Sequence, residues 1–450
     1  MTHSISNSYV SVSVTEKIGY GLGDFASNLS FGFVSLFLLF YYTDIYGITA
    51  AQASIIFVVA RIIDAIYNLA IGYLVDNTNS RHGKLRPYLL YGAIPLGLLT
   101  TLCFILINGE YKFIFALFSY TLYCLAYTTV NTPYSAMTNT ITQNEQSRAS
   151  LSVYRFTLAS IGYLVVSTSA TPLVASFSTQ QIGYLSAVAI YSSIATIAFI
   201  ACFYFTKERV SIEEKQGSIS FNEIKSTVLK NKPLINVSLY TLLFYIAYTV
   251  WMAIIIYYIQ YVLNMPNFVT LFFLVQTAAY TTGVIVSEKL ISWFGKKNAA
   301  LYGLLFGMAG LLLQYFVAED NIYLIMTFIC MFSITLGIGF VTMWSMVPDT
   351  VEHAEWHHQV RAEGSIYGFY NFITKIGMAL GGGCAGLMLE LFEYSSEHIT
   401  ETAIMGINIS ITLLPAGLFL LCFLVVMFYE LNEDTYRSLV IKIQQRKSQA

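Results

Sequence analysis

Long apolar segments, separated by short polar ones, occupy almost the entire chain. About 20 apolar residues are enough for a helix to cross the hydrocarbon core of a bilayer. By this criterion the sequence predicts an all-α membrane protein with about twelve transmembrane helices. The expected spans are residues 18–43, 52–75, 86–108, 112–139, 149–174, 182–206, 233–261, 267–293, 299–317, 321–347, 364–391 and 402–430.

The composition supports a membrane protein. Hydrophobic residues make up 56% of the 450 residues, and charged residues make up only 11%. Soluble domains carry roughly 25% charged residues, so a soluble fold is disfavoured. Residues 1–17 are polar and lack the pattern of a cleavable signal peptide, so we expect none.

The distribution of Lys and Arg predicts the orientation. If the N-terminus is cytoplasmic, the outer loops hold only Lys112, whereas the inner loops and the tail hold a long series of cations. Because such an excess marks the cytoplasmic side, both termini are expected there. The net charge of −2 then gives no sign of nucleic-acid binding. The inner cations are Arg81, Lys84, Arg86, Arg148, Lys207, Arg209, Lys215, Lys225, Lys230, Lys232, Lys296, Lys297, Arg361, Arg437, Lys442, Arg446 and Lys447.

The longest polar stretch between spans, residues 206–233, separates the first six predicted spans from the last six. Two such halves are expected of a parallel repeat related by an axis along the membrane normal. The expected division is an N-terminal half at 1–206, a cytoplasmic middle loop at 207–232, a C-terminal half at 233–430 and a cytoplasmic tail at 431–450.

The second predicted span contains two ionisable residues, Arg61 and Asp64. A charge at the bilayer centre costs about 2.5–3.5 kcal/mol on insertion scales, so its presence there indicates a function. Asn68 follows Asp64 by one turn, which places both side chains on one helix face. The pattern favours an ion-binding site, and therefore a transporter.

Polar residues also mark the first and fourth spans. Asp24 and Asn28 lie one turn apart on the first, although Asp24 could instead sit at a cytoplasmic helix end. The fourth carries a stripe at helical spacing, which either lines a cavity or forms hydrogen bonds between helices. The stripe consists of Thr128, Asn131, Ser135 and Thr138.

Arg155 and Lys375 are further deep cations, in the fifth and eleventh spans. They could serve an anionic substrate or neutralise a carboxylate that releases its proton or cation. The residues alone do not choose between these roles.

Residues 349–363 are predicted to form a loop dense in acids and histidines. His353 and His357 could bind zinc together with a carboxylate. Weak ion pairs with basic inner loops are the favoured interpretation, and such pairs are suited to gating. We therefore expect no metal.

Nothing in the sequence indicates catalysis, since no nucleophile elbow, Walker loop or H-E-x-x-H motif is present. The six cysteines fall within predicted spans and are expected to be buried thiols. The alternatives are an exporter of amphipathic compounds, a membrane-embedded enzyme and a sensor. An exporter should show a broad apolar cavity with few polar contacts, a sensor would normally add a soluble output domain, and the midplane charges disfavour an enzyme.

Several blocks, in this order and spacing, resemble the glycoside–pentoside–hexuronide:cation symporter family of the major facilitator superfamily, in particular its glucuronide and xyloside carriers. The blocks are residues 19–24, 41–44, 61–65, 81–87, 131–134 and 349–364. The resemblance implies a monomeric symporter in a bacterial inner membrane, with a sugar substrate and no cofactor.

The resemblance also implies roles for individual residues. The cation site would comprise Asp64, Asn68 and Thr128. The sugar site would comprise Asp24, Asn28, Asn131, Tyr134, Ser135, Arg155 and Lys375. Inner gating ion pairs would involve Arg148, Lys296, Lys297, Asp349, Glu352, Glu355 and Arg361.

Asn68 departs from the melibiose-carrier pattern, which has a second carboxylate at this position. Asn also replaces carboxylates at 28 and 131, which would ease entry of a uronate. Hard cations prefer several oxygen ligands, whereas a proton needs one titratable group. We therefore expect H⁺ as the coupling ion, with Na⁺ as the alternative.

Overall fold

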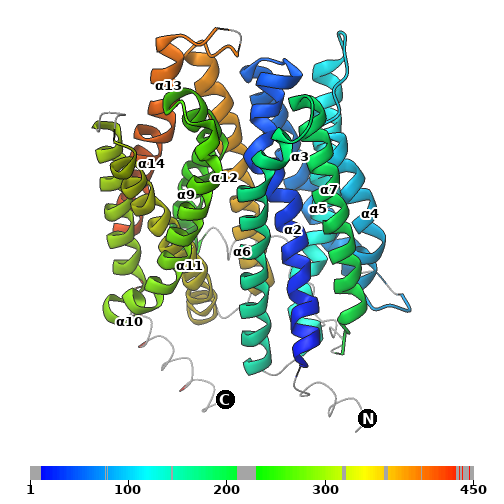
Figure 1. Cartoon of the computed structure of the whole chain (residues 1–450). Coiled ribbons are helices and arrows are strands. Elements are labelled where there is room, and N and C mark those ends of the chain that lie inside the picture. Colours follow the sequence, from blue (N-terminus) through cyan, green and yellow to red (C-terminus); the bar gives the residue numbers. More distant parts are fainter. Residues whose placement is uncertain are drawn as a thin grey trace. The chain divides into compact units, whose positions relative to one another are not determined.

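The structure is a computed structural model of the whole chain. It describes residues 12–209 except 77, 79, 143 and 144; residues 230–431 except 317–320, 359–362 and 397; and residues 435, 438 and 445. All regular secondary structure in these ranges is helical (Figure 1). Most of the tail and most of the middle loop expected from the sequence lie outside the described residues.

The chain forms two compact units, each of which is described by itself. Unit 1 comprises Met1–Glu214, Pro266–Leu274 and Ser395–His398. Its helices, in order, are α2 (Val14–Phe40), the π-helical turn η1 (Tyr41–Tyr46), α3 (Ala50–Asp76), α4 (Arg86–Leu102), α5 (Lys112–Ile141), α6 (Glu145–Ala175) and α7 (Gln180–Phe205). Within this unit α2 packs on α6 and α7, and α5 packs on α3 and α4.

Unit 2 comprises Lys215–Met265, Val275–Tyr394 and Ile399–Ala450. Its α9 packs against α11, α12, α13 and α14. The helices of the C-terminal part of the chain are α9 (Lys232–Tyr257), the π-helical turn η2 (Tyr258–Val262), α10 (Val269–Phe316), α11 (Ile322–His358), α12 (Glu363–Leu391), α13 (Glu401–Ile411) and α14 (Leu413–Met427). A short 3₁₀ turn, η3 (Pro266–Phe268), precedes α10.

Ten helical segments of the described chain are long and apolar enough to cross a membrane. One of them, Pro266–Phe316, contains two of the spans expected from the sequence. Gly295 interrupts α10 between these two spans, with a φ of 76° that only glycine adopts easily. The 17-residue α4 corresponds to another expected span.

The expectation of a loop from residue 349 onward is wrong for its first part. The helix α11 continues to His358 and includes Pro348. Hydropathy detects only the lipid-crossing part of a helix, whereas the acidic and aromatic residues beyond it are also compatible with helix. The gating candidates at 349, 352 and 355 therefore project from a helix.

A local contact recurs in the two units. In unit 1 the thiol of Cys202 on α7 donates to the carbonyl of Tyr20 on α2, at 3.8 Å. In unit 2 the thiol of Cys422 on α14 donates to the carbonyl of Tyr240 on α9, at 3.7 Å. Both pairs are separated by 182 residues. The first and last long helices of each unit thus meet through the same residue types at the same spacing.

Close helix packing in unit 2 depends on glycine. A Cβ at Gly337 of α11 would lie 2.4 Å from the carbonyl oxygen of Tyr280 and 2.6 Å from the amide nitrogen of Val284, both on α10. At Gly283, a Cβ would lie 2.1 Å from the carbonyl oxygen of Ile334. The two backbones therefore touch without an intervening side chain, as in small-residue interfaces of membrane helices.

Gly337→Ala should destabilise the protein by about 1–3 kcal/mol, because the obstructing atoms belong to backbone that cannot rotate away. Thermal unfolding of the detergent-solubilised protein measures this loss. Gly368→Ala is the matched control, since a Cβ there meets nothing within 4 Å. Equal melting temperatures for both variants would contradict the close approach of α10 and α11.

Candidate functional site

Polar contacts between α3 and α5 surround the carboxylate of Asp64 in unit 1. The Thr128 hydroxyl donates to Oδ1 of Asp64, whose side chain is buried with 1% exposure. One turn along, the Thr132 hydroxyl donates to Oδ1 of Asn68, at 2.8 Å. Tyr67 and Thr129 share a hydrogen bond of 3.0 Å. We refer to these six residues as the α3–α5 seam.

The seam follows from helical spacing on both sides of the contact. Asp64 and Asn68 are four residues apart, and so are Thr128 and Thr132, so each pair shares one helix face. The predicted cation-site residues Asp64, Asn68 and Thr128 are therefore brought together. Thr132 and Tyr67 join them, although the sequence indicated no contact for either residue.

Arg61 lies one turn before Asp64, with its guanidinium against aromatic rings. Its Cζ is 5.5 Å from the ring centroid of Phe31 and 6.0 Å from that of Tyr120. Such cation–π contacts stabilise a desolvated guanidinium by up to about 2 kcal/mol. The rings of α2 and α5 thus help to hold this charge inside the unit.

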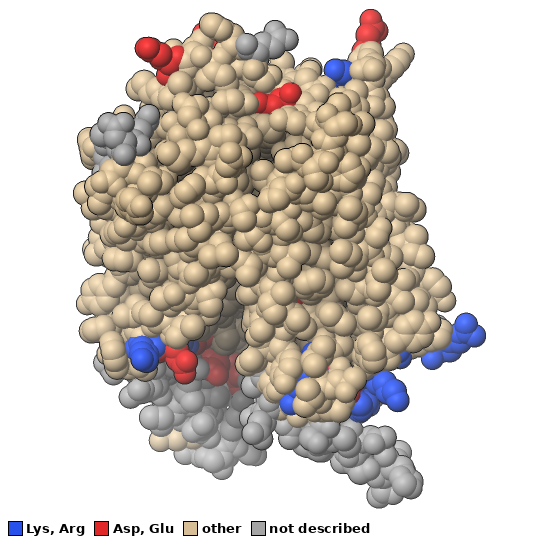
Figure 2. Space-filling view, in the orientation of Figure 1, with Lys and Arg blue, Asp and Glu red and all other residues tan. Residues whose placement is uncertain are grey.

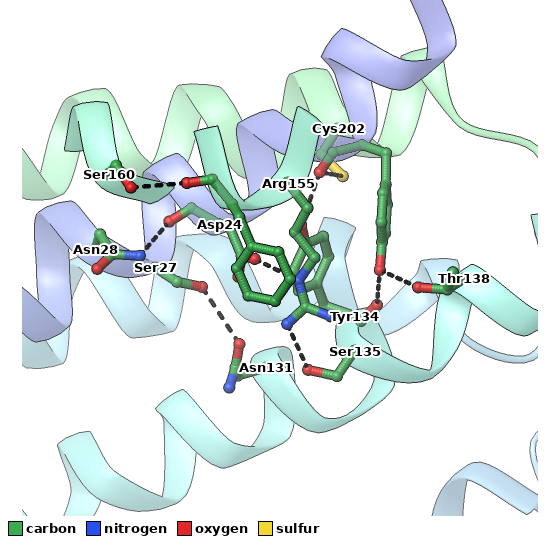
Figure 3. A network of polar contacts seen from close by, with 12 residues as sticks. Asp24, Ser27, Asn28, Asn131, Tyr134, Ser135, Thr138, Arg155, Ser160 and Cys202 are labelled. Carbon is green, nitrogen blue, oxygen red and sulfur yellow. Dashed lines mark hydrogen bonds and ion pairs between the residues drawn. The ribbon is translucent and has the colours of Figure 1, made fainter. Parts of the chain in front are cut away.

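A second polar network joins α2, α5 and α6 (Figure 3). The carboxylate of Asp24 forms an ion pair with Nε of Arg155. Asp24 is only 7% exposed, and its partner belongs to a helix 131 residues further along the chain. Nη2 of Arg155 also donates to the hydroxyl of Ser135, at 3.4 Å. Pairing compensates two charges that would each be costly in the membrane interior.

The asparagines predicted for the sugar site lie at the edge of this network. The Ser27 hydroxyl donates to Oδ1 of Asn131, at 3.4 Å. Nδ2 of Asn28 donates to the backbone carbonyl of Asp24, at 2.9 Å (Figure 3). These bonds place Asn28 against Asp24 on α2 and bring Asn131 of α5 against Ser27 of α2.

Tyr134 packs against Arg155 and holds it in place. Its ring centroid is 5.2 Å from Cζ of Arg155, and its hydroxyl donates to the carbonyl of Tyr20, at 2.8 Å. The Tyr20 hydroxyl in turn shares a hydrogen bond of 2.6 Å with Thr138. A Cβ at Gly23 would lie 2.2 Å from Cε2 of Tyr134, so only glycine leaves room for this ring. The glycine-rich start of α2 could have indicated such a close approach, but not its partner.

Lys375, the remaining predicted sugar-site residue, lies half-buried on α12 in unit 2. The structure describes its unit separately from unit 1, so its predicted role stays a prediction.

One of the predicted gating pairs is present within unit 2. Nζ of Lys296 donates to both carboxylate oxygens of Asp349, at 2.7 and 2.9 Å. Nζ of Lys297 instead donates to the carbonyls of Met427 and Tyr429, at 2.7 and 2.9 Å. Lys297 therefore caps the end of α14, where free carbonyls attract a cation.

The other gating candidates lie at the end of α11 or outside the described side chains. Glu355 is buried, and Oε2 of the half-buried Glu352 has no hydrogen-bond partner among the described residues. The side chains of Arg148 and Arg361 lie outside the described residues. No group of three metal-binding side chains occurs among the residues described.

Glu208 and Arg209, which follow α7, connect it to the starts of α2 and α4 within unit 1, and the sequence did not indicate these contacts. Arg209 forms a two-pronged pair with Glu16, both bonds being 2.8 Å. This hydrogen-bonded carboxylate raises the pKa of Arg209, so the cation persists at any physiological pH. The Glu208 carboxylate accepts from the backbone amides of Lys84, Leu85 and Arg86, which satisfies free N–H groups at the start of α4.

A comparison with known families identifies the chain. A model of the family described as MFS/sugar transport protein matches residues 19–433. The chain belongs to this family. It is therefore a multi-pass sugar transporter of the bacterial inner membrane rather than an enzyme, and the resemblance observed in the sequence blocks is confirmed.

Relatives match along nearly the whole chain. The uncharacterized symporter YnaJ of Bacillus subtilis (strain 168) is 36% identical over 455 residues, covering 98% of this chain and 97% of its own length. The glucuronide carrier protein homolog of Escherichia coli (strain K12) is 33% identical, with 96% and 95% covered. The isoprimeverose transporter of Lactiplantibacillus pentosus is 31% identical, with 93% and 89% covered.

Solved structures show the same fold at low sequence identity. The nucleoside transporter NupG superposes with a TM-score of 0.66 at 11% identity, covering 92% of this chain and 98% of that one. A bacterial homologue of the human lysosomal transporter Spinster gives 0.67 at 13% identity, with 95% and 97% covered. These likenesses support the architecture alone.

Proposed function

We propose that this protein is a proton-coupled symporter that imports a glycoside, with glucuronides and xylosides the first substrates to test. The observation that carries this proposal is the α3–α5 seam, where Thr128 of α5 donates to the buried carboxylate of Asp64. The same helix carries Ser135, which accepts from Arg155 in the Asp24–Arg155 network. Among the relatives are a glycoside/cation symporter, a glucuronide carrier homologue and an isoprimeverose transporter by name. Their near-complete coverage supports cation-coupled sugar symport here.

The proposal includes twelve spans and cytoplasmic termini. Ten segments are long enough to span, α4 adds one, and the interruption of α10 at Gly295 adds another. On the face shown in Figure 2, Lys and Arg gather mainly near the lower end of the view. This distribution supports a cytoplasmic location for that end.

The hydrogen bonds of the seam favour H⁺ over Na⁺. Asp64 provides its single carboxylate, and its neighbour Asn68 already accepts a hydrogen bond from Thr132. A bound Na⁺ would need several oxygen ligands, by analogy with other hard cations, and this amide oxygen is already engaged. A proton on Asp64 needs no further ligand, and Thr128 can reorient its hydroxyl to accept from the protonated acid.

The α2–α5–α6 network suits a sugar. Asp24 offers acceptor oxygens and Arg155 offers donors in a fixed fork, so together they can bind adjacent hydroxyl groups. Asn28 and Asn131 add neutral groups that both donate and accept. Because Asp24 compensates the charge of Arg155, hydroxyl recognition explains this pair better than recognition of an anion does.

Coupling requires that proton and sugar together stabilise the states through which the loaded carrier changes access. The seam and the sugar network share α5, which carries Thr128 and Asn131 one turn apart. Protonation at Asp64 can therefore bias the position of the same helix that presents sugar-binding groups.

Uptake into proteoliposomes should be driven by an imposed proton gradient and not by an imposed sodium gradient. A panel of radiolabelled glucuronides, xylosides and neutral glycosides, each tested with the two gradients separately, measures this. Accumulation driven by sodium alone would overturn the proton assignment. Absence of uptake for every glycoside, from a preparation that is folded by thermal unfolding, would overturn the substrate class.

A further inference from the structure

An apolar groove of about 470 Å³ lies between α4 and α5 in unit 1. Tyr91, Pro95 and Leu99 form its α4 side, and Leu122 and Ala126 form its α5 side. Thr129 of its lining also belongs to the α3–α5 seam, and the other lining residues have no part in the transport chemistry proposed above.

The groove opens toward the surroundings of the helices rather than into the polar networks. Tyr91 in its wall is 65% exposed, and Leu98 and Phe118 nearby are 67% and 58% exposed. On helices that cross a membrane, exposed large apolar side chains contact lipid. The natural occupant of such a groove is an acyl chain.

The length of the groove along α4 is close to the thickness of the hydrocarbon layer of one leaflet. From Pro87 to Leu99 the wall extends along α4 for about 18 Å at 1.5 Å per residue. Half of the hydrocarbon core measures about 15 Å. One acyl chain from one leaflet therefore fills the groove from end to end, whereas a transmembrane partner helix would continue beyond it.

One end of the groove is polar and adjoins a basic loop. Thr78 and Tyr88 line this end and share a hydrogen bond of 2.7 Å between their hydroxyls. The loop that connects them contains Arg81, which is exposed, and Lys84, which is half-exposed. An apolar channel that ends at two cations complements a lipid with an anionic headgroup.

We propose that this groove binds one acyl chain of an anionic phospholipid, with Arg81 and Lys84 interacting with its phosphate. The lipid comes from the leaflet that faces the α3–α4 loop. The groove reaches the transport machinery at Thr129, which lines it and hydrogen-bonds to Tyr67 of the α3–α5 seam.

Native mass spectrometry of the full-length protein, released from micelles containing phosphatidylglycerol or phosphatidylcholine with identical acyl chains, tests the proposal. The wild type should retain one phosphatidylglycerol in preference to phosphatidylcholine. Arg81→Gln and Lys84→Gln should each weaken this preference about fivefold, as expected for one basic residue near an anionic surface.

Ala126→Leu should release the lipid regardless of headgroup, because the larger side chain occupies the groove. Ala189→Leu, at a half-exposed position on α7 outside the groove, is the matched control and should retain the lipid. Equal retention of both lipids by the wild type, unchanged retention by Ala126→Leu, or a lipid-independent dimer would overturn the proposal.

Discussion

Asp64→Asn should abolish concentrative sugar uptake while leaving sugar exchange measurable. Asn keeps an oxygen that can accept from Thr128, so the α3–α5 seam should stay intact. It cannot bind or release a proton between about pH 4 and 9, so the sugar gradient loses its connection to the proton gradient. We expect the accumulation ratio to fall from well above one to one.

Proteoliposomes loaded with unlabelled sugar measure both quantities, since counterflow reports exchange and an imposed gradient reports accumulation. Glu110→Gln, which removes an exposed carboxylate outside the seam, is the control and should accumulate sugar as the wild type does. Unimpaired accumulation by the Asp64 variant would remove that residue from the coupling mechanism, and loss of counterflow would show that it also supports the sugar site.

Much of the fold could be predicted because a bilayer permits few solutions. Backbone polar groups must be satisfied within each crossing segment, so apolar runs become helices. The bounds of α5 (Lys112–Ile141) and α12 (Glu363–Leu391) lie within two residues of those expected. Hydropathy did not predict the helix where it extends beyond the lipid, as at the end of α11. In water, backbone polar groups can hydrogen-bond to solvent, so both a helix and a loop are possible there.

The members of the seam could be predicted because helical spacing relates Asp64 to Asn68 on one face. The partners of Asp24 and Arg61 could not be predicted. Arg155 is 131 residues from Asp24, and no local rule connects α2 with α6. Arg61 contacts Phe31 and Tyr120, and these contacts depend on how three helices meet.

Arg155→Gln should both destabilise the protein and abolish sugar binding. Removing one partner of a buried ion pair leaves an uncompensated charge and costs about 3–5 kcal/mol. The lower end of this range applies because both side chains of the pair are partly exposed to solvent. The Arg155 side chain is 23% exposed and that of Asp24 is 11% exposed. Thermal unfolding and equilibrium binding of a labelled glycoside, measured on the same purified sample, separate the two effects.

The double variant Asp24→Asn, Arg155→Gln distinguishes recognition from stability. It removes both charges and retains groups that can form hydrogen bonds. The melting temperature should therefore recover most of the decrease caused by Arg155→Gln alone. Sugar affinity should remain at least tenfold weaker, since the fixed fork of donors and the carboxylate acceptors are both gone. Recovery of affinity together with stability would mean that the pair only holds α2 against α6 and does not touch the sugar.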